Sequence, residues 1–336
     1  MGKFNLIDEP WVKVVYKETG NCELVSLKKL FEDAEKIEGI AGDTKTQDFA
    51  VLRVILAVLH VVYSRFDANG NVYAVMTLND QFIPTKIDVD ANTRSGYKRA
   101  LYNTWKELWD RRAFTNSVYE YLSKWQDRFY LFDKEHPFMQ IRERDLESYD
   151  YKNQKGTKKT TDREGRALNL KIAESEKKIA LFSPKIKQDD KSKLTEDEVA
   201  RWIITCHNYI DAADKTDFIV ERKYDNKSSG WLSELGGICL EGDNLFETLM
   251  MNLILIHPEE KYIFSVQKPC WEYEPQEVLD SCLKGDICDN LAQLYTSWSR
   301  AIYISPEIDP QKGFTCQMIK LPAIEKKDQF LEPMTL

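Results

Sequence analysis

One long apolar segment constrains the fold of this chain more than any other feature. Residues 46–65 carry apolar side chains at helical spacing on two adjoining faces, so a helix here is apolar nearly all round. The stretch from Phe49 to Val62 is too short to cross a bilayer, and it contains Arg53 and His60. We therefore predict a buried helix at the centre of the core of a soluble, cytoplasmic protein.

The size and composition support a large core. The chain has 336 residues, which is enough for about two domains. Its composition, 43% hydrophobic and 30% charged residues, excludes wholesale disorder. Lys and Arg number 47 against 55 Asp and Glu, so the net charge is −8. An acidic chain is a poor first guess for a nucleic-acid binder, although an average charge does not exclude a local basic patch.

The cysteines and histidines predict neither disulfides nor a metal. The seven cysteines are odd in number and no Cys-x-x-Cys occurs, which indicates scattered thiols in a reducing compartment. Cys282 and Cys288 have the wrong spacing for zinc, and the four histidines lie far apart in the sequence. We expect no metal and no cofactor.

Helices and short strands alternate along the rest of the chain. Short strands are predicted in residues 3–26, with Ser26 capping a helix through Phe31. An aromatic stripe at helical spacing fits a core helix better than a base-stacking platform; it comprises Val118, Tyr121, Leu122, Trp125 and Phe129. Two helices are predicted in residues 97–129, the second of them capped by Asn116. A capping box at 195–198 starts another helix, and a further helix starts at Asp243. Strands are predicted at 262–266, 298–304 and 314–320.

The segment at about 150–193 differs from its surroundings in charge. Between Lys152 and Lys193 there are thirteen Lys or Arg and six Asp or Glu, a local net charge of +7, with little apolar periodicity. This pattern predicts a long, flexible basic loop. Two interpretations stay open: a solvated surface excursion, or a phosphate-binding segment that orders on nucleic acid.

Catalytic motifs are missing from the sequence. It contains no Gly-x-Ser-x-Gly elbow, no Walker motif and no Gly-x-Gly-x-x-Gly. The acids Asp189 and Asp190 lie in a polar run, which favours a solvated surface over a catalytic pair. His136, which precedes Pro137, is interpreted as a hydrogen-bonded structural histidine.

Several segments together resemble one family. Residues 4–12 resemble the N-terminal signature of CasA, the large subunit of the type I-E CRISPR Cascade, and residues 129–140 resemble its second signature. Residues 178–182 and 243–249 are similar to two further segments in the right order, and residues 41–50 also fit. The resemblance covers nearly the whole chain.

This resemblance implies a fold and a role. The fold would be α+β, with mixed helices and short antiparallel sheets in one irregular N-terminal domain over residues 1–336, without the family's C-terminal four-helix bundle. The subunit would be non-catalytic. It would bind the guide RNA and other Cascade subunits, read the short motif that flanks the target in double-stranded DNA, and help recruit the helicase–nuclease for antiviral defence.

The resemblance also implies nucleic-acid-binding residues. The family approaches the minor groove of the duplex with a small-residue loop and a lysine. The loop maps to Asn226, Lys227, Ser228, Ser229 and Gly230, and the lysine to Lys320, with Lys312, Lys326 and Lys327 as rivals. The basic loop would contact the complex through Lys158, Lys159, Arg163 and Arg166.

Two other hypotheses remain at this point. The chain could be a structural adaptor that binds the complex without touching DNA, or an enzyme of unrecognised type, which the lack of a metal-ligand cluster disfavours. Residues 331–336 are expected to leave an exposed apolar edge, because the apolar segment has no polar tail to cover it.

Overall fold

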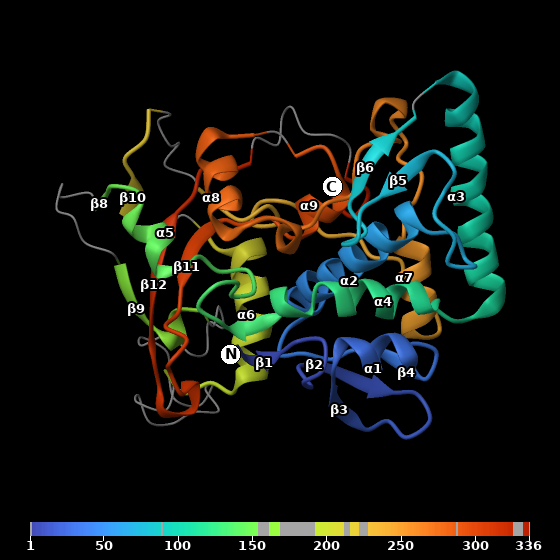
Figure 1. Ribbon diagram of the computed structural model, residues 1–336. Helices are drawn as coiled ribbons and strands as arrows, with labels where there is room; N and C mark the ends of the chain where they lie inside the picture. Colours follow the sequence, from blue (N-terminus) through green and yellow to red (C-terminus); the bar gives the residue numbers. More distant parts are fainter. Residues whose placement is uncertain are drawn as a thin grey trace.

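A long central helix organises the protein. The computed structural model describes residues 2–88, 90–153, 161–168, 192–211, 216–221, 228–286, 288–324 and 332–335. Helix α2 (Lys45–Arg65) runs through the middle of the molecule and packs against α4, α6 and α9 (Figure 1). It is long and apolar enough to cross a membrane, but its side chains are mostly buried inside the protein. The predicted core helix is confirmed.

The N-terminal residues form two small antiparallel sheets. Strand β1 (Lys3–Asn5) pairs with β7 (Tyr130–Phe132), which joins the chain start to a segment far along the sequence. A three-stranded sheet has the order β3-β2-β4, and Ser26 caps α1 as predicted. The elements are β2 (Val12–Tyr16), β3 (Cys22–Val25), α1 (Leu27–Glu32) and β4 (Ile37–Ile40).

The two predicted helices of the next region are present. Helix α3 (Ala91–Arg111) follows the hairpin of β5 (Met76–Leu78) and β6 (Pro84–Ile87). Helix α4 (Asn116–Lys124) begins one residue earlier than predicted, because Thr115 and not Asn116 stands at the N-cap position. The aromatic stripe is buried, so its interpretation as core is confirmed.

A mixed sheet forms the other end of the protein. Its order is β11-β12-β10-β8, with β9 also pairing β12, and only β10 and β12 run parallel. Strands β11 (Arg300–Tyr303) and β12 (Thr315–Lys320) confirm the predictions. The sequence pattern did not indicate β8 (Tyr151–Asn153) or β9 (Thr161–Glu164), which lie within the basic segment, nor did it indicate β10 (Thr216–Phe218).

The remaining helices fill the space between these sheets. The capping box of Thr195 and Glu198 starts α6 as predicted, and Asn244 caps α7. The predicted strand at 262–266 is wrong, since a 3-10 turn over Glu260–Tyr262 stands at its start and no strand follows. The α-helices are α5 (Glu143–Glu147), α6 (Glu196–Tyr209), α7 (Leu245–Asn252), α8 (Pro275–Lys284) and α9 (Leu291–Tyr295). The other 3-10 helices are η1 (Gln126–Arg128), η2 (Gly165–Ala167), η7 (Cys270–Glu272) and η8 (Pro310–Lys312). Together these elements make an α+β fold.

Residues 332–335 pack into the core. Met334 is 2% exposed, and the carboxylate of Glu332 lies 3.1 Å from the buried guanidinium of Arg53 on α2. The indole of Trp231 donates to the same carboxylate, and the Met334 carbonyl accepts from Ile238. The expectation of an exposed apolar edge is therefore wrong for these residues.

Candidate nucleic-acid interface

The described end of the small-residue loop is fixed against α6. The chain leaves α6 at Ile210, and the Gly230 N–H donates back to the Ile210 carbonyl at 2.9 Å. A β-carbon on Gly230 would collide with the backbone of Asn208 and lie 2.7 Å from the carbonyl oxygen of His207. Only glycine allows this close approach of two backbones. The requirement for glycine at this position therefore comes from packing within the protein.

A buried arginine joins this loop to the sheet. Arg300 on β11 donates to the carbonyl of Ser228 at 2.9 Å and to that of Asp211 at 2.7 Å. It thereby holds both ends of the connection from α6 to the loop. Its guanidinium also bonds the carbonyl of Ser299. Sequence reasoning missed Arg300, and the available signal was a charged residue inside the apolar strand pattern of 298–304.

Lys320 lies beside Arg300 at the end of β12. It is the ladder partner of Arg300 on one side and of Asp217 on the other. Adjacent strands lie about 5 Å apart, so the structure brings the predicted loop and the predicted lysine close together. The Lys320 side chain is only 4% exposed, and its ammonium lies 2.8 Å from the carboxylate of Asp217, which is 32% exposed. Lys320 is therefore a paired and nearly buried cation.

The arginines of the basic segment lie at the other end of β12. Arg163 on β9 is the ladder partner of Cys316, four residues before Lys320, a separation of about 13 Å along the strand. Arg166 is held by Glu164, with 2.9 Å between guanidinium and carboxylate. One strand thus connects both groups of predicted residues.

The other predicted contacts divide into two sets. The rival Lys312 is exposed on η8 and pairs with Asp309 at 3.0 Å. The rest lie outside the described residues: Asn226, Lys227, Lys158, Lys159, Lys326 and Lys327. Of the loop, Ser228 and Gly230 are buried, while Ser229 is half-buried.

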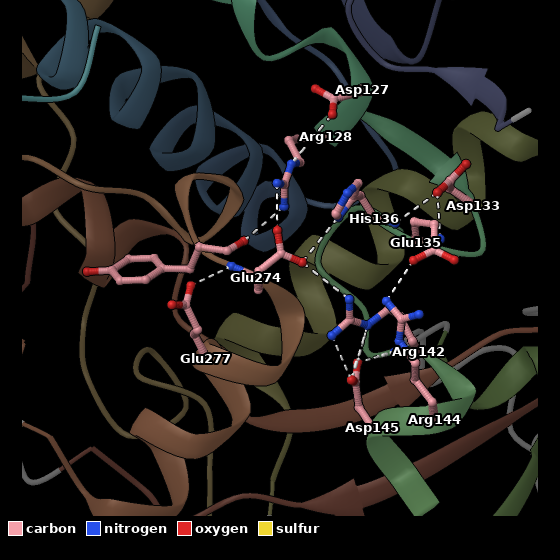
Figure 2. Close-up of polar contacts among 11 residues, drawn as sticks. Asp127, Arg128, Asp133, Glu135, His136, Arg142, Arg144, Asp145, Glu274 and Glu277 are labelled. Carbon is pink, nitrogen blue, oxygen red and sulfur yellow. Dashed lines mark hydrogen bonds and ion pairs between the residues drawn. The ribbon is translucent and has the colours of Figure 1, made fainter. Parts of the chain in front are cut away.

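His136 belongs to a cluster of polar side chains around Glu274, shown in Figure 2. The carboxylate of Glu274 accepts from Arg128 at 2.7 Å and from Arg142 at 3.2 Å, and lies 3.7 Å from Nδ1 of His136. Burial, and then the nearby Arg128, lower the pKa of His136. The cluster attaches the segment after α4 to the start of α8, which is a structural arrangement.

His207 makes a second structural link. Its Nε2–H donates to the Met139 carbonyl at 2.9 Å, and its Nδ1 accepts from the Ser299 N–H at 3.3 Å. Burial lowers the pKa of His207 to about 4, so the ring is neutral at neutral pH. Residues 129–140, which resemble the second CasA signature, are thereby attached to α6 and to the residue that precedes Arg300 and strand β11.

Three cysteines line one cavity, and burial disfavours the thiolate form that a nucleophile needs. Cys270, Cys282 and Cys288 line a cavity of about 350 Å³ beside α8. Burial raises the pKa of each thiol to about 12, so all three are protonated at neutral pH. Within the described part of the chain, no group of three or more His, Cys, Asp or Glu side chains could hold a metal ion.

Comparison with known protein families places the chain in a class of CRISPR-associated proteins. It belongs to the family of CRISPR-associated protein Cse1, whose pattern it matches over residues 5–336. The CasA resemblance is thereby confirmed, since a solved relative from Thermus thermophilus is described as CasA (Cse1). No curated protein matches this chain.

Solved structures share the fold at low sequence identity. Cse1 of Thermobifida fusca is 24% identical with a TM-score of 0.64, and the match covers 99% of this chain and 54% of that one. The Thermus thermophilus protein is 18% identical with a TM-score of 0.59, covering 97% and 53%. A chain of a CRISPR RNA-guided surveillance complex is 15% identical with a TM-score of 0.65, covering 98% and 57%. This chain therefore spans about half the length of these structures.

Proposed function

We propose that this chain acts as a non-catalytic subunit of a CRISPR RNA-guided surveillance complex in the cytoplasm. In that role it binds the guide complex, reads the target-flanking motif in double-stranded DNA and helps to recruit a helicase–nuclease. Membership of the Cse1 family and the shared fold with a chain of such a complex support this role. Guide pairing reads most of the target, so the protein needs to read only a short flank.

One structural observation carries the proposed DNA contact. Arg300 binds the Ser228 carbonyl and is the ladder partner of Lys320. The small-residue loop and the lysine were predicted as DNA contacts 90 residues apart in the sequence, and they meet at this arginine. Their proximity supports a single shared contact with a duplex.

The alternative of a structural adaptor is favoured by burial. Ser228 and Gly230 are buried, and Lys320 is paired with Asp217. Side chains with these surroundings hold the protein together without any ligand. Under this alternative the chain contacts its partner subunits and makes no contact with the DNA.

Removing the carboxylate partner of Lys320 distinguishes DNA reading from the adaptor alternative. Asp217→Asn keeps the shape of the side chain but removes the charge that neutralises Lys320. If the lysine faces DNA, the variant binds target duplex more tightly and its preference among flanking sequences changes. Asp309→Asn is the matched control, because it releases the exposed Lys312 from a similar pair.

The assay is a duplex titration with a complex reconstituted around each variant, using targets with different flanks. Tighter binding and altered preference for Asp217→Asn alone support DNA reading at Lys320. Equal affinity and equal preference for both variants and the unaltered chain support the adaptor. Helicase–nuclease recruitment is measured separately, as pull-down of that protein by the assembled complex.

A further inference from the structure

A groove beside strand β4 leaves one edge of a sheet open. Strand β4 is an outer strand of the sheet β3-β2-β4, and Figure 1 shows it at the edge of the molecule, near α7. The groove has a volume of about 670 Å³, which lies in the usual range for ligand sites. Its walls are Val15 and residues from the ranges 38–41, 45–52 and 239–248. All four residues from 38 to 41 contribute, so β4 lies along the groove.

The backbone of β4 can accept another strand. The Ala41 N–H donates to the Lys13 carbonyl at 2.8 Å. Bonded and free positions alternate along an antiparallel ladder, so the N–H and C=O of Ile40, opposite Val14, point away from β2. Outside the sheet, no group in the described part of the chain bonds to these two Ile40 atoms. An open edge of this kind can bind an extended polypeptide as a further strand.

The walls of the groove are acidic. The charged side chains that line it are Glu38, Lys45, Asp48 and Glu241. Glu38 and Glu241 are exposed, and among the described residues no group bonds to either carboxylate. The Asp48 side chain is 13% exposed and lies 3.8 Å from the Lys45 ammonium, and burial raises the pKa of Asp48. A second cation in the groove would therefore stabilise the charged form of this carboxyl.

The excess of acids extends beyond the lining side chains. Residues 38–48 and 239–248 together contain one base, Lys45, and six acids. Bases from other segments, among them Lys13, Lys17 and Arg112, reduce this excess without removing it. Arg112 is already bound to Glu247 at 2.6 Å. The six acids are Glu38, Asp43, Asp48, Glu241, Asp243 and Glu247.

The open strand edge and the acidic walls together select the occupant. Free carboxylates repel the phosphates of a nucleic acid. A second copy of this chain that paired through its own β4 would bring the same carboxylates together. A small molecule would leave the outward backbone groups of β4 without a strand partner. An extended polypeptide with basic side chains satisfies both the backbone and the charges.

We infer that the groove beside β4 binds an extended, basic segment of a partner protein as an added strand. Main-chain bonds to β4 supply affinity, and the carboxylates of Glu38, Asp48 and Glu241 select lysine or arginine. Side chains of a strand alternate between its two faces, so the segment alternates basic and apolar residues. The apolar residues meet Phe49 and Leu52 of α2, which also line the groove. The inference stands independently of the proposed function.

The first test is the binding of synthetic peptides to the full chain. The probe is a fluorescent peptide of alternating lysine and valine, about eight residues long, which is within the usual length of a strand. Binding is measured by fluorescence anisotropy at low salt. We expect the chain to bind this peptide and to bind an alternating glutamate and valine peptide much more weakly. Equal binding of both peptides, or no binding of the lysine peptide, would overturn the inference.

Peptide N-methylation tests the main-chain bonds. Methyl groups on every second nitrogen remove the N–H donors from one edge of the added strand and leave the other edge intact. Two such peptides, methylated on opposite edges, should therefore differ in affinity by at least about tenfold, because one of them keeps the edge that pairs with β4. Equal affinities would refute strand addition.

A glycine variant locates the binding in the groove. Gly39 lies in β4 and lines the groove, and no heavy atom lies within 4 Å of a β-carbon added there. Gly39→Val therefore fills the groove without a collision inside the protein. Gly96→Val is the matched control, because an added β-carbon at this exposed glycine of α3 also has no neighbour within 4 Å. Circular dichroism verifies that both variants remain folded.

A charge variant tests the selection of basic residues. Glu38→Lys with Glu241→Lys reverses the two exposed carboxylates of the groove. Glu18→Lys with Asp80→Lys makes the same charge change at exposed acids elsewhere.

The two groove variants should weaken binding of the lysine peptide by at least about tenfold, and the two controls by less than about threefold. Equal effects of groove variants and controls would overturn the inference. Loss of binding on charge reversal with full binding by Gly39→Val would indicate surface ion pairing and would also contradict it. These measurements use no nucleic acid, so their outcome is distinct from that of the flank titrations.

Discussion

Replacement of Arg300 by methionine tests how the candidate interface is held. The side chain donates to two distant carbonyls, those of Ser228 and Asp211, at 2.9 and 2.7 Å. A hydrogen bond to a charged group contributes about 1.5–3 kcal/mol. Two such bonds give about 3–6 kcal/mol, and access of water to the freed carbonyls favours the lower end. We expect Arg300→Met to weaken attachment of the loop by about 3 kcal/mol.

Amide hydrogen exchange resolves where this loss occurs. The Gly230 and Leu232 amides bond to the end of α6 and report on loop attachment. A loss of about 3 kcal/mol accelerates their exchange by roughly a hundredfold when opening is local. Amides in the middle of α2 should change far less. Unchanged protection at Gly230 and Leu232, with urea stability within 1 kcal/mol of the unaltered chain, would refute the reasoning.

Two controls define the cause. Arg300→Lys keeps the charge, but one compact ammonium replaces the planar fork that reaches both carbonyls, so less than half of the protection returns. Arg144→Met removes an exposed arginine that pairs with Glu135 on the surface. Its effect should stay below about 1 kcal/mol, because surface ion pairs contribute little.

Two further predictions concern stability. Burial lowers the pKa of His60 to about 3 and that of His207 to about 4, so the unfolded chain binds these protons first as the pH falls. The free energy of unfolding in urea should therefore be at its full value above pH 6.5 and fall below that pH by about 1.4 kcal/mol per pH unit for each ring. His207→Gln should reduce the slope of this fall. An equal slope in the variant refutes the prediction. Glu332→Gln should cost about 3 kcal/mol in urea unfolding, because it leaves the guanidinium of Arg53 buried without a countercharge. The surface change Glu307→Gln should cost less than about 1 kcal/mol, and equal costs would contradict the argument.

Local patterns in the sequence predicted the elements that local physics determines. The apolar faces of 46–65 indicated α2, and the capping box at Thr195 indicated α6, because each signal lies within the element it forms. Strands β8 and β9 were not predicted. They are short and polar, and their partners β10 and β12 lie well over 50 residues later. No local pattern identifies such a pairing, which depends on the assembled core.

In the candidate site, too, the sequence indicated some features and missed those that depend on the assembled fold. Composition and family resemblance selected the loop at Ser228–Gly230 and Lys320, but they did not indicate Arg300 or the burial of the lysine. The pairing of Lys320 with Asp217 joins residues more than 100 positions apart. Its existence follows from the parallel register of β10 and β12, which the sequence does not specify. Residue type was therefore predictable here, and electrostatic state was not.

The pairing of Lys320 with Asp217 has a consequence for the proposed DNA reading. A paired cation gains little when a phosphate anywhere along the duplex approaches, because the existing ion pair must be given up first. A flank that places a hydrogen-bond acceptor at the lysine compensates for the broken ion pair, and a flank without such an acceptor does not. The pair thus suits discrimination between flanks in the proposed function. Asp217→Asn should therefore change the flank preference in the duplex titration, and equal preference in the variant and the unaltered chain would contradict this reasoning.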